Sequence, residues 1–411
     1  MNFEQIIALD KADPLAKKRL EFDLPANTIY LDGNSLGALP KSVKARVSEV
    51  VSQQWGNDLI KSWNSHSWID LPIKVGEKIA PLIGAGQGQV ICCDSISVNL
   101  FKLLCSALTL NSERSVVLST KDNFPTDLYM VQGLSDLLGP DLCQLQMVAE
   151  QDILENLTES VAVLLLTQVN FRTGKLLDMA KLTQLAHDKG ILVIWDLAHS
   201  AGALPVELDK CEADFAVGCG YKYLNGGPGS PAFLYVAKRH QTLARQPLSG
   251  WMGHAKPFAF DPLYAPATTI NQFQCGTPSV ISMSVLDAAL DVWQNVSLLQ
   301  VRKKSEALAD VFLELIKMNT CLHNLVLCSP DVAKQRGSQL AFSHDDAFAI
   351  CQALIEKGVI ADFRAPNILR FGFTPLYTSF EDVWLAVATL ADIVESEMYK
   401  KPRFNVALKV T

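Results

Sequence analysis

The sequence predicts an α/β protein with a large domain on a mainly parallel sheet and a smaller C-terminal α+β domain. Short apolar, β-branched runs alternate with helical stretches in the middle of the chain. This alternation is typical of a parallel sheet that is buried on both faces. The pattern mixes helix and strand again after about residue 300, and 411 residues suffice for more than one core. We expect an N-terminal helix and arm at 1–45, a large domain at 46–295 and a small domain at 296–411.

The elements follow from local patterns along the chain. The first 30 or so residues are charged and then rich in turn formers, which predicts a short helix followed by an extended arm. Apolar residues at helical spacing predict helices from about 40 to 60, over 100–110 and 180–189, and from about 280 to beyond 293. The residues that carry the first of these patterns are Val43, Val47, Val50, Val51 and Trp55. The predicted strands are Val116–Ser119, Val161–Leu166, Ile191–Trp195, Phe215–Gly218, Ala232–Val236 and, in the small domain, Ile368–Gly372. The Pro- and Gly-rich stretch 247–278 is expected to be a long loop.

Composition excludes several classes of protein. The 36 Lys and Arg against 43 Asp and Glu give a formal net charge of −7, which argues against a nucleic-acid partner. No purely apolar run is longer than Val161–Leu166, far short of the roughly 18 residues of a membrane helix. The N-terminus lacks the pattern of a signal peptide. Ten scattered cysteines without a Cys-x-x-Cys pair indicate reduced thiols in the cytoplasm, and dispersed histidines make a metal site improbable.

A carboxylate and an amine follow two neighbouring strands. Asp196 ends the strand 191–195, His199 comes three residues later, and Lys222 follows the strand 215–218 within a Gly-rich segment. Because ligands of open α/β sheets bind at the carboxyl ends of the strands, both side chains are expected in one crevice. Pyridoxal phosphate requires this pair: a lysine for a Schiff base and a carboxylate for the pyridine nitrogen. Separately, Asp196 could be a turn residue and Lys222 a solvated side chain, but their order and spacing favour a pyridoxal phosphate enzyme of the aminotransferase-like fold.

Two further segments supply cofactor contacts. Ile96 and Ser97 lie where the apolar helix 100–110 is expected to begin, and a helix N-terminus attracts the phosphate anion. A plain N-cap is the alternative, and it is compatible with phosphate binding. The run Phe124-Pro125-Thr126-Asp127 offers a ring that could stack on the cofactor, or an ordinary turn anchored by proline.

Arg370 lies inside the apolar strand 368–372. A planar guanidinium suits a substrate carboxylate held by two hydrogen bonds. An internal salt bridge to an acidic residue is an equally good interpretation, and the sequence leaves the two open.

Several motifs together resemble kynureninase, from about residue 25 to the C-terminus. They are Tyr30-Leu-Asp-Gly-Asn-Ser-Leu-Gly37, Phe124-Pro-Thr-Asp127, Gln168-Val-Asn-Phe-Arg-Thr-Gly174, Trp195-Asp-Leu-Ala-His-Ser-Ala-Gly202, Gly220-Tyr-Lys-Tyr-Leu-Asn-Gly-Gly-Pro-Gly229, Gly250-Trp-Met-Gly-His254 and Arg370-Phe-Gly-Phe-Thr-Pro-Leu-Tyr377. The resemblance implies fold type I, class V, with 46–295 as the domain that binds pyridoxal 5'-phosphate. It also implies the hydrolysis of L-kynurenine, or 3-hydroxykynurenine, to anthranilate, or 3-hydroxyanthranilate, and L-alanine, in tryptophan degradation and NAD biosynthesis.

The resemblance also implies roles for single residues. Lys222 would carry the Schiff base and move the α-proton, Asp196 would pair with the pyridine nitrogen, and Tyr221 would contact the phosphate and assist proton transfer. Developing oxyanion charge at the ketone needs a donor, and Tyr221 is the candidate for it. The other implied cofactor contacts are Ile96, Ser97, Phe124, Pro125, Thr126, Asp127, Thr167 and His199. Trp251 and Thr277 would reach the phosphate from the partner subunit of a homodimer; some members have Asn at the position of Thr277. Arg370 would hold the substrate carboxylate, and residues around Trp63, His66 and Trp68 would influence the choice of substrate.

Three other functions are alternatives to kynureninase activity for a protein of this fold. A cysteine desulfurase of the same fold needs a nucleophilic Cys near the small-domain Arg, and Phe-Gly-Phe-Thr-Pro follows Arg370 instead. An aminotransferase would need a second keto acid to complete its cycle. A catalytically silent protein of this fold would have no need of Lys222 and Asp196.

Overall fold

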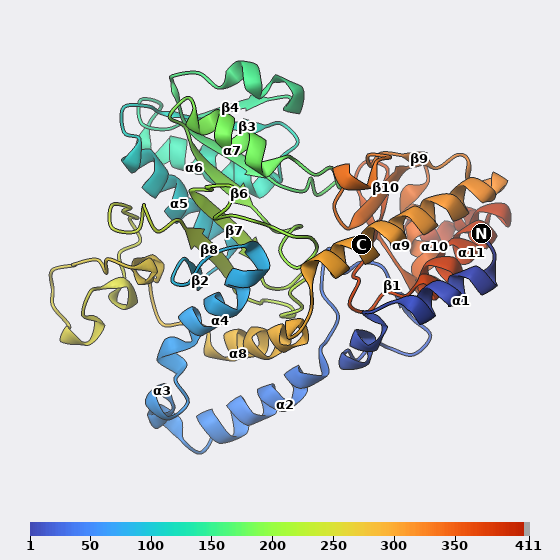
Figure 1. The fold of residues 1–411 in the computed structure, drawn as a ribbon, viewed down its shortest axis with the longest axis horizontal. Coiled ribbons are helices and arrows are strands. Elements are labelled where there is room, and N and C mark those ends of the chain that lie inside the picture. The colour runs from blue at the N-terminus through green and yellow to red at the C-terminus, as the bar shows by residue number, and fades with distance from the viewer. Residues whose placement is uncertain (407–411) are drawn as a thin grey trace.

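A computed structural model of the chain describes residues 1–406 and shows two lobes, one with a seven-stranded sheet and one with a four-stranded and a two-stranded sheet (Figure 1). The larger sheet has seven strands. In spatial order they are β2 (Val90–Cys92), β8 (Ala232–Val236), β7 (Phe215–Cys219), β6 (Leu192–Asp196), β5 (Val161–Thr167), β3 (Val116–Thr120) and β4 (Gln144–Val148). Every pairing from β7 to β4 is parallel, and β8 is antiparallel to both of its neighbours. The predicted mainly parallel sheet is confirmed.

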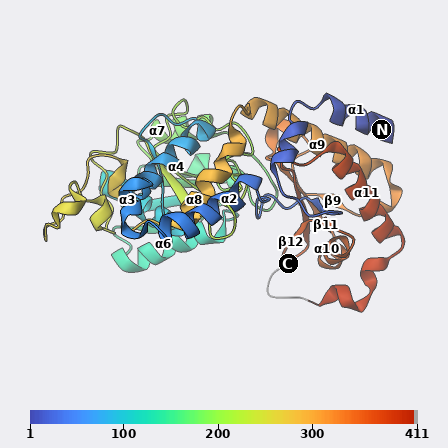
Figure 2. The same cartoon turned by 90° about the horizontal axis from the view of Figure 1, so that it is seen from below.

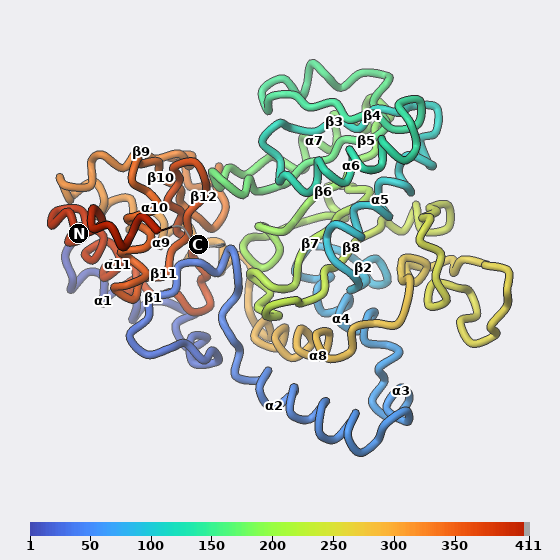
Figure 3. Tube along the Cα trace, turned by 180° about the vertical axis from the view of Figure 1, so that it is seen from behind, coloured from blue at the N-terminus to red at the C-terminus, as the bar shows by residue number. Residues whose placement is uncertain are grey.

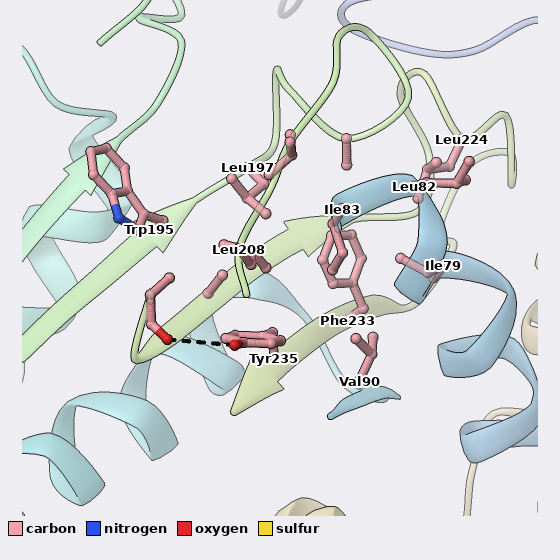
Figure 4. Close-up of a cluster of buried hydrophobic side chains, with 14 of the residues drawn as sticks. Ile79, Leu82, Ile83, Val90, Trp195, Leu197, Leu208, Leu224, Phe233 and Tyr235 are labelled. Carbon is pink, nitrogen blue, oxygen red and sulfur yellow. Dashed lines mark hydrogen bonds between the residues drawn. The ribbon is translucent and has the colours of Figure 1, made fainter. Parts of the chain in front are cut away.

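Helices cover both faces of this sheet. They are α4 (Leu71–Ile79), α7 (Met179–His187) and α8 (Val280–Ala289) on one face, and α5 (Ile96–Leu110) and α6 (Pro125–Leu138) on the other. Successive residues of one strand pack into opposite cores. In β6, Val193 and Trp195 join the first cluster while Ile194 joins the second. The close-up of the first cluster shows Trp195 and Leu197 on the same side of the sheet as Phe233 and Tyr235 (Figure 4). Burial on both faces explains why the central strands are apolar without alternation.

The smaller lobe is an antiparallel sheet packed against helices. Its strand order is β12 (Asp362–Arg364), β13 (Ile368–Gly372), β10 (Gln339–Ser343) and β9 (Val326–Leu327). The helices α9 (Leu298–Met318), α10 (Ala347–Glu356) and α11 (Phe380–Glu395) contribute to its core.

The N-terminal arm belongs to the small lobe's core. Helix α1 (Phe3–Ala12) lies beside α9 and α11 (Figure 2), and β1 (Ile29–Tyr30) pairs in parallel with β11 (Val359–Ile360). Ile6 and Leu31 are fully buried in the same cluster as the C-terminal helices. The expected boundaries at 45 and 295 stay a prediction.

The remaining helices, α2 (Lys41–Glu49) and α3 (Ser62–Ser65), run along the edge of the large lobe, as the trace from behind also shows (Figure 3). Two helices differ from expectation at their ends. The pattern over 43–55 is α-helical only to Glu49 and continues as a π-helical segment, Val50–Trp55. The helix from Val280 turns into a 3₁₀ segment at Leu290–Trp293. Among the described residues, no helix is both long and apolar enough to cross a membrane.

Candidate active site

A cavity of about 230 Å³ lies where β3, β5, β6 and β7 end. It collects residues that are up to 137 positions apart in the sequence, from Ser95 to Ala232. Ten of the predicted site residues line it: Ile96, Ser97, Phe124, Thr126, Asp127, Thr167, Asp196, His199, Tyr221 and Lys222. A larger groove of about 850 Å³ runs between the N-terminal arm and α8, but its lining contains no titratable side chain. Chemistry therefore belongs to the smaller cavity.

Lys222 and His199 are in direct contact. Lys222 follows β7, His199 follows β6, and Lys222 Nζ lies 2.9 Å from His199 Nε2. Burial lowers the pKa of Lys222 from its usual value. Burial, together with repulsion from Lys222, lowers the pKa of His199 well below its usual value. The lowered pKa values favour the neutral form of both side chains, and an amine can accept a proton only in its neutral form.

Two buried carboxyl groups face the same cavity. Asp196, the last residue of β6, accepts a hydrogen bond from the Ala198 backbone N–H at 2.7 Å, and Thr167 Oγ1 lies 3.4 Å from its Oδ2. Asp127, in the first turn of α6, is fully buried, and neither of its carboxyl oxygens has a hydrogen-bond partner among residues 1–406. Burial raises the pKa of both groups, and the charge of Asp196 raises that of Asp127 further. A cationic hydrogen-bond donor in the cavity would stabilise the ionised form of such buried carboxyl groups.

The first turn of α5, which also lines the cavity, is suited to bind an anion. Helix α5 begins at Ile96, and its N-cap, Ser95, accepts a hydrogen bond from the Val98 N–H at 3.3 Å. The backbone N–H groups of the first turn and the helix dipole favour negative charge here. Behind this turn, the fully buried Lys102 forms an ion pair with Asp94 and donates to the Phe273 carbonyl at 2.6 Å. The predicted N-terminus near Ser97 is therefore correct to within one turn.

Aromatic rings lie at the mouth of the cavity. Phe124 is the N-cap residue of α6, and Pro125 occupies the first helical position, as is common for proline. The Phe124 ring meets the Phe171 ring edge to face, with centroids 5.2 Å apart. Pro125 itself does not line the cavity. The segment is thus a helix start rather than an isolated turn.

Arg370 is held by an internal ion pair. Its Nε donates to Asp362 Oδ1 at 3.0 Å, its Nη2 contacts Asp362 Oδ2 and donates to Ser35 at 3.0 Å, and its Nη1 donates to the Phe171 carbonyl. The salt-bridge interpretation that the sequence left open is therefore confirmed, and Arg370 is not among the cavity-lining residues. It lies directly behind Phe171, which does line the cavity.

Comparisons with known proteins agree with this geometry. The kynureninase of Burkholderia pseudomallei strain 1106a is 49% identical over 413 residues, which cover 99% of each chain. The kynureninase of Deinococcus radiodurans is 51% identical over 400 residues, covering 96% of this chain and 97% of its own. A family model described as the kynureninase C-terminal domain matches residues 301–390.

The chain belongs to the kynureninase family. Among solved structures, a C-DES variant with glycine covalently linked to its PLP cofactor has a TM-score of 0.78 at 18% identity, and the match covers 91% of this chain and 99% of that one. This likeness concerns the fold, and it confirms the predicted aminotransferase-like architecture.

Two residues that the resemblance to kynureninase implies as phosphate contacts do not line the active-site cavity. Thr277 lines a separate cavity of about 140 Å³ next to Asp94. Trp251 is 40% exposed and packs against Phe258 and Phe260.

The predicted substrate-pocket residues also lie elsewhere. Trp63 meets Trp68 edge to face on the α3 side of the large lobe, and His66 contacts Asp58 at 2.8 Å. None of the three lines the cavity.

Sequence reasoning assigned no role to four residues that the structure brings to the site. Phe171 lies in the segment Gln168–Gly174, and Asn123 directly precedes Phe124. The Asn123 side chain accepts from the Thr167 hydroxyl and, at 2.7 Å, from the Phe124 N–H. Gln339 and Asp362 are fully buried or nearly so and contact His199 and Arg370. Each is a polar residue at the start of a short strand, and such a residue is too common to indicate a site.

Proposed function

We propose that this chain is a pyridoxal phosphate-dependent kynureninase. It hydrolyses the bond between the β and γ carbons of L-kynurenine or 3-hydroxykynurenine and releases anthranilate or 3-hydroxyanthranilate together with L-alanine. Family membership at about half identity over the whole chain carries the proposal. The cavity supports it with Lys222 and Asp196 on adjacent strand ends.

The residues present fit the cofactor. Asp196 and the unpaired Asp127 carboxyl offer partners for a protonated pyridine nitrogen, and the first turn of α5 offers backbone donors for a phosphate. Lys222 supplies the amine for covalent attachment. When bound, pyridoxal phosphate supplies the electron sink that stabilises negative charge on the substrate carbons.

Lys222 is proposed as the base that moves the substrate α-proton. Burial lowers the pKa of this side chain, which brings a neutral amine closer to working pH. His199 Nε2, at 2.9 Å, lies close enough to hold the amine in place.

Tyr221 is proposed as the donor to the oxygen of the substrate ketone. Burial raises the pKa of its phenol, so that Tyr221 stays protonated at neutral pH and can donate. Donation to developing oxyanion charge stabilises the transition state, and general acid–base help is typically worth about 10²–10⁴-fold.

Arg370 is proposed to bind the substrate carboxylate. Asp362, Ser35 and the Phe171 carbonyl already occupy most of its donors. The substrate would therefore use the remaining Nη1 hydrogen or displace the Phe171 carbonyl. The Asp362 ion pair keeps the guanidinium plane fixed before substrate arrives.

A homodimer is proposed to complete the site. The loop that carries Trp251 projects from the large lobe (Figures 1 and 3), and its Phe258, Phe260 and Leu263 side chains are more than 60% exposed. The apolar groove beside α8 is a second surface suited to burial in a partner. Trp251 and Thr277 line no part of their own chain's cavity, so their implied contact with the phosphate needs a second copy.

The dimer has a direct test. We expect the chain to elute as a dimer, measured by light scattering, and Phe260→Asp to shift it toward monomer and weaken cofactor binding. Lys256→Ala, in the same loop, is the matched control. A wild-type monomer with full activity would contradict the dimer.

The enzyme is proposed to act in the cytoplasm. All ten cysteines are unpaired, as is typical of a reducing compartment.

Lys222→Ala tests the activity itself. The purified wild-type protein should be yellow and should release anthranilate and alanine from L-kynurenine without any added keto acid. Lys222→Ala should abolish both the colour and the turnover. Turnover near the wild-type rate in this variant would refute the site assignment, and a requirement for a keto acid would indicate an aminotransferase.

A further inference from the structure

Gln339 reaches the site from the other lobe. It is the first residue of β10 in the small sheet, it is fully buried, and its Oε1 lies 3.1 Å from Nδ1 of His199. His199 in turn contacts Lys222 through its other ring nitrogen. The three side chains therefore form a continuous chain of hydrogen bonds from the small lobe to the reactive amine.

The orientation of the Gln339 amide is determined by its second set of partners. Its Nε2 donates to the Phe171 carbonyl at 3.0 Å and to the Asn170 carbonyl at 3.3 Å. Carbonyl oxygens only accept, so the amide nitrogen must face them. The amide oxygen must then face His199 and accept a hydrogen bond. This requires a proton on His199 Nδ1.

The surroundings keep His199 neutral. Burial and the positive charges of Lys222, Arg370 and Arg364 lower the pKa of the imidazole. On the same segment, the Asp196 carboxylate accepts a hydrogen bond from the Ala198 N–H at 2.7 Å. With the single ring proton on Nδ1, Nε2 presents a lone pair to Lys222.

The backbone around Gln339 holds this amide in place. The loop at 170–176 bonds to the segment that precedes β10, with Gly337 N–H donating to the Gly174 carbonyl at 2.7 Å and Leu176 N–H to the Gln335 carbonyl at 2.9 Å. Gly174 has φ +74°, and a Cβ there would lie 2.9 Å from Gln339 Cγ. A side chain at 174 would therefore push Gln339 away from its two carbonyl partners.

We propose that Gln339 is a positioning residue that fixes the Nδ1–H tautomer of His199, so that Lys222 donates to His199 Nε2 and keeps its own lone pair free. The inference rests on the proposed role of Lys222 as the base. A neutral amine has one lone pair, and its N–H donated to Nε2 leaves that pair available for the substrate α-proton. In the opposite tautomer, Nε2–H would donate to the amine and occupy the pair. After proton transfer, the resulting ammonium still donates to Nε2.

Nitrogen NMR reads the tautomer directly. The full chain is labelled with ring-¹⁵N histidine and studied both without and with pyridoxal phosphate. There are seven histidines in the sequence, and His199→Gln identifies the relevant signals. In the cofactor-free wild type we expect a protonated-type Nδ1 and an unprotonated-type Nε2. A wild-type His199 that carries its proton on Nε2, or that interconverts between tautomers, overturns the proposal without any variant.

Gln339→Met keeps the side-chain length and removes the acceptor. We expect the two tautomers to mix in this variant and kcat to fall about 10²-fold, within the range of general base catalysis, while KM changes less than threefold. An unchanged tautomer together with kcat near the wild-type value overturns the proposal.

Ser329→Ala is the matched control. It removes the hydrogen bond from Ser329 Oγ to the Thr173 carbonyl at 2.6 Å, which also joins the loop at 170–176 to the small lobe. It removes as well the bond that Ser329 Oγ accepts from the Ala341 N–H in β10 at 2.9 Å, and it leaves His199 untouched. We expect its tautomer and kcat to match the wild type. An equal loss of kcat in Ser329→Ala would assign the effect to lobe packing and overturn the tautomer role. The NMR experiment needs no turnover, so it tests the tautomer of His199 even if the proposed kynureninase activity is not found. The failure of one proposal can therefore be distinguished from the failure of the other.

Discussion

Removing the Asp214 carboxylate should destabilise the sheet that positions the active site. Asp214 precedes β7, and its side chain is 2% exposed. Its Oδ2 accepts from the Val193 N–H and contacts His187 Nε2, both at 2.8 Å, while its Oδ1 lies 2.7 Å from Arg239 Nη2 and from His240 Nε2. One carboxylate thus ties together β6, the end of α7 and the segment after β8.

The magnitude follows from what Asp214→Ala leaves behind. The buried Val193 N–H loses its partner, which costs about 1–3 kcal/mol. The loss of a buried, multiply bonded charge costs about 3–5 kcal/mol in total, but Arg239 is 45% exposed and can return to water. We therefore expect a loss of about 3 kcal/mol. Asp214→Asn should lose about half as much, because its oxygen can still accept from Val193.

Urea denaturation followed by far-UV circular dichroism measures this loss. Asp188→Asn, an exposed position in the same corner of the sheet, serves as control and should stay within about 0.5 kcal/mol of the wild type. A midpoint for Asp214→Ala equal to that of the control would refute the reasoning.

The same carboxylate predicts a pH dependence with a definite sign. Burial opposes ionisation, but hydrogen bonds from His187 and His240 hold the pKa of Asp214 well below its ordinary value. A depressed folded-state pKa means that the contribution is complete above the unfolded value of about 4 and is lost as the pH falls below it. The stability difference between wild type and Asp214→Ala should therefore be constant from about pH 7 to 5 and shrink in stronger acid.

Two further predictions concern the two ends of the site. Lys102→Met removes the buried partner of Asp94 behind the first turn of α5, and fluorescence titration should show pyridoxal phosphate binding weakened about 10-fold, the worth of roughly one hydrogen bond. Unchanged affinity for pyridoxal phosphate would contradict the inference that Lys102 supports the first turn of α5. Arg370→Ala should raise KM for kynurenine at least about 10-fold by removing a charged hydrogen bond, with cofactor absorbance retained; loss of cofactor with unchanged KM would contradict the carboxylate role.

The parts of the fold that sequence predicted are those with strong, local signals. Buried strands such as Val161–Thr167 and Phe215–Cys219 are continuous apolar runs, and both were placed to within a residue. The edge strand Gln144–Val148 was missed because its residues are mostly exposed or half-buried and carry no clear apolar pattern. Val90–Cys92 was missed because three residues are too few for a pattern.

Some residues of the site could likewise be predicted from the sequence, and others could not. Asp196, His199 and Lys222 could be predicted because their chemistry is anchored to strand ends of one sheet. Gln339 could not, since its role depends on how the second lobe packs against the first. The partner of Arg370 likewise became evident only when β12 and β13 lay side by side, with Asp362 opposite Arg370.

The location of Ile6 and Leu31 in the small lobe has a consequence for synthesis on the ribosome. The other buried residues of this core lie between 308 and 404, so the segment that carries Ile6 and Leu31 has no partner there until those residues have been synthesised. The large lobe, whose strands are complete by residue 236, can fold earlier as a unit. Helix α1 must therefore stay exposed until the residues of the small lobe have been synthesised. Truncating the first thirty-one residues should therefore leave the later-made lobe unable to mature, even though no strand of the catalytic sheet has been removed.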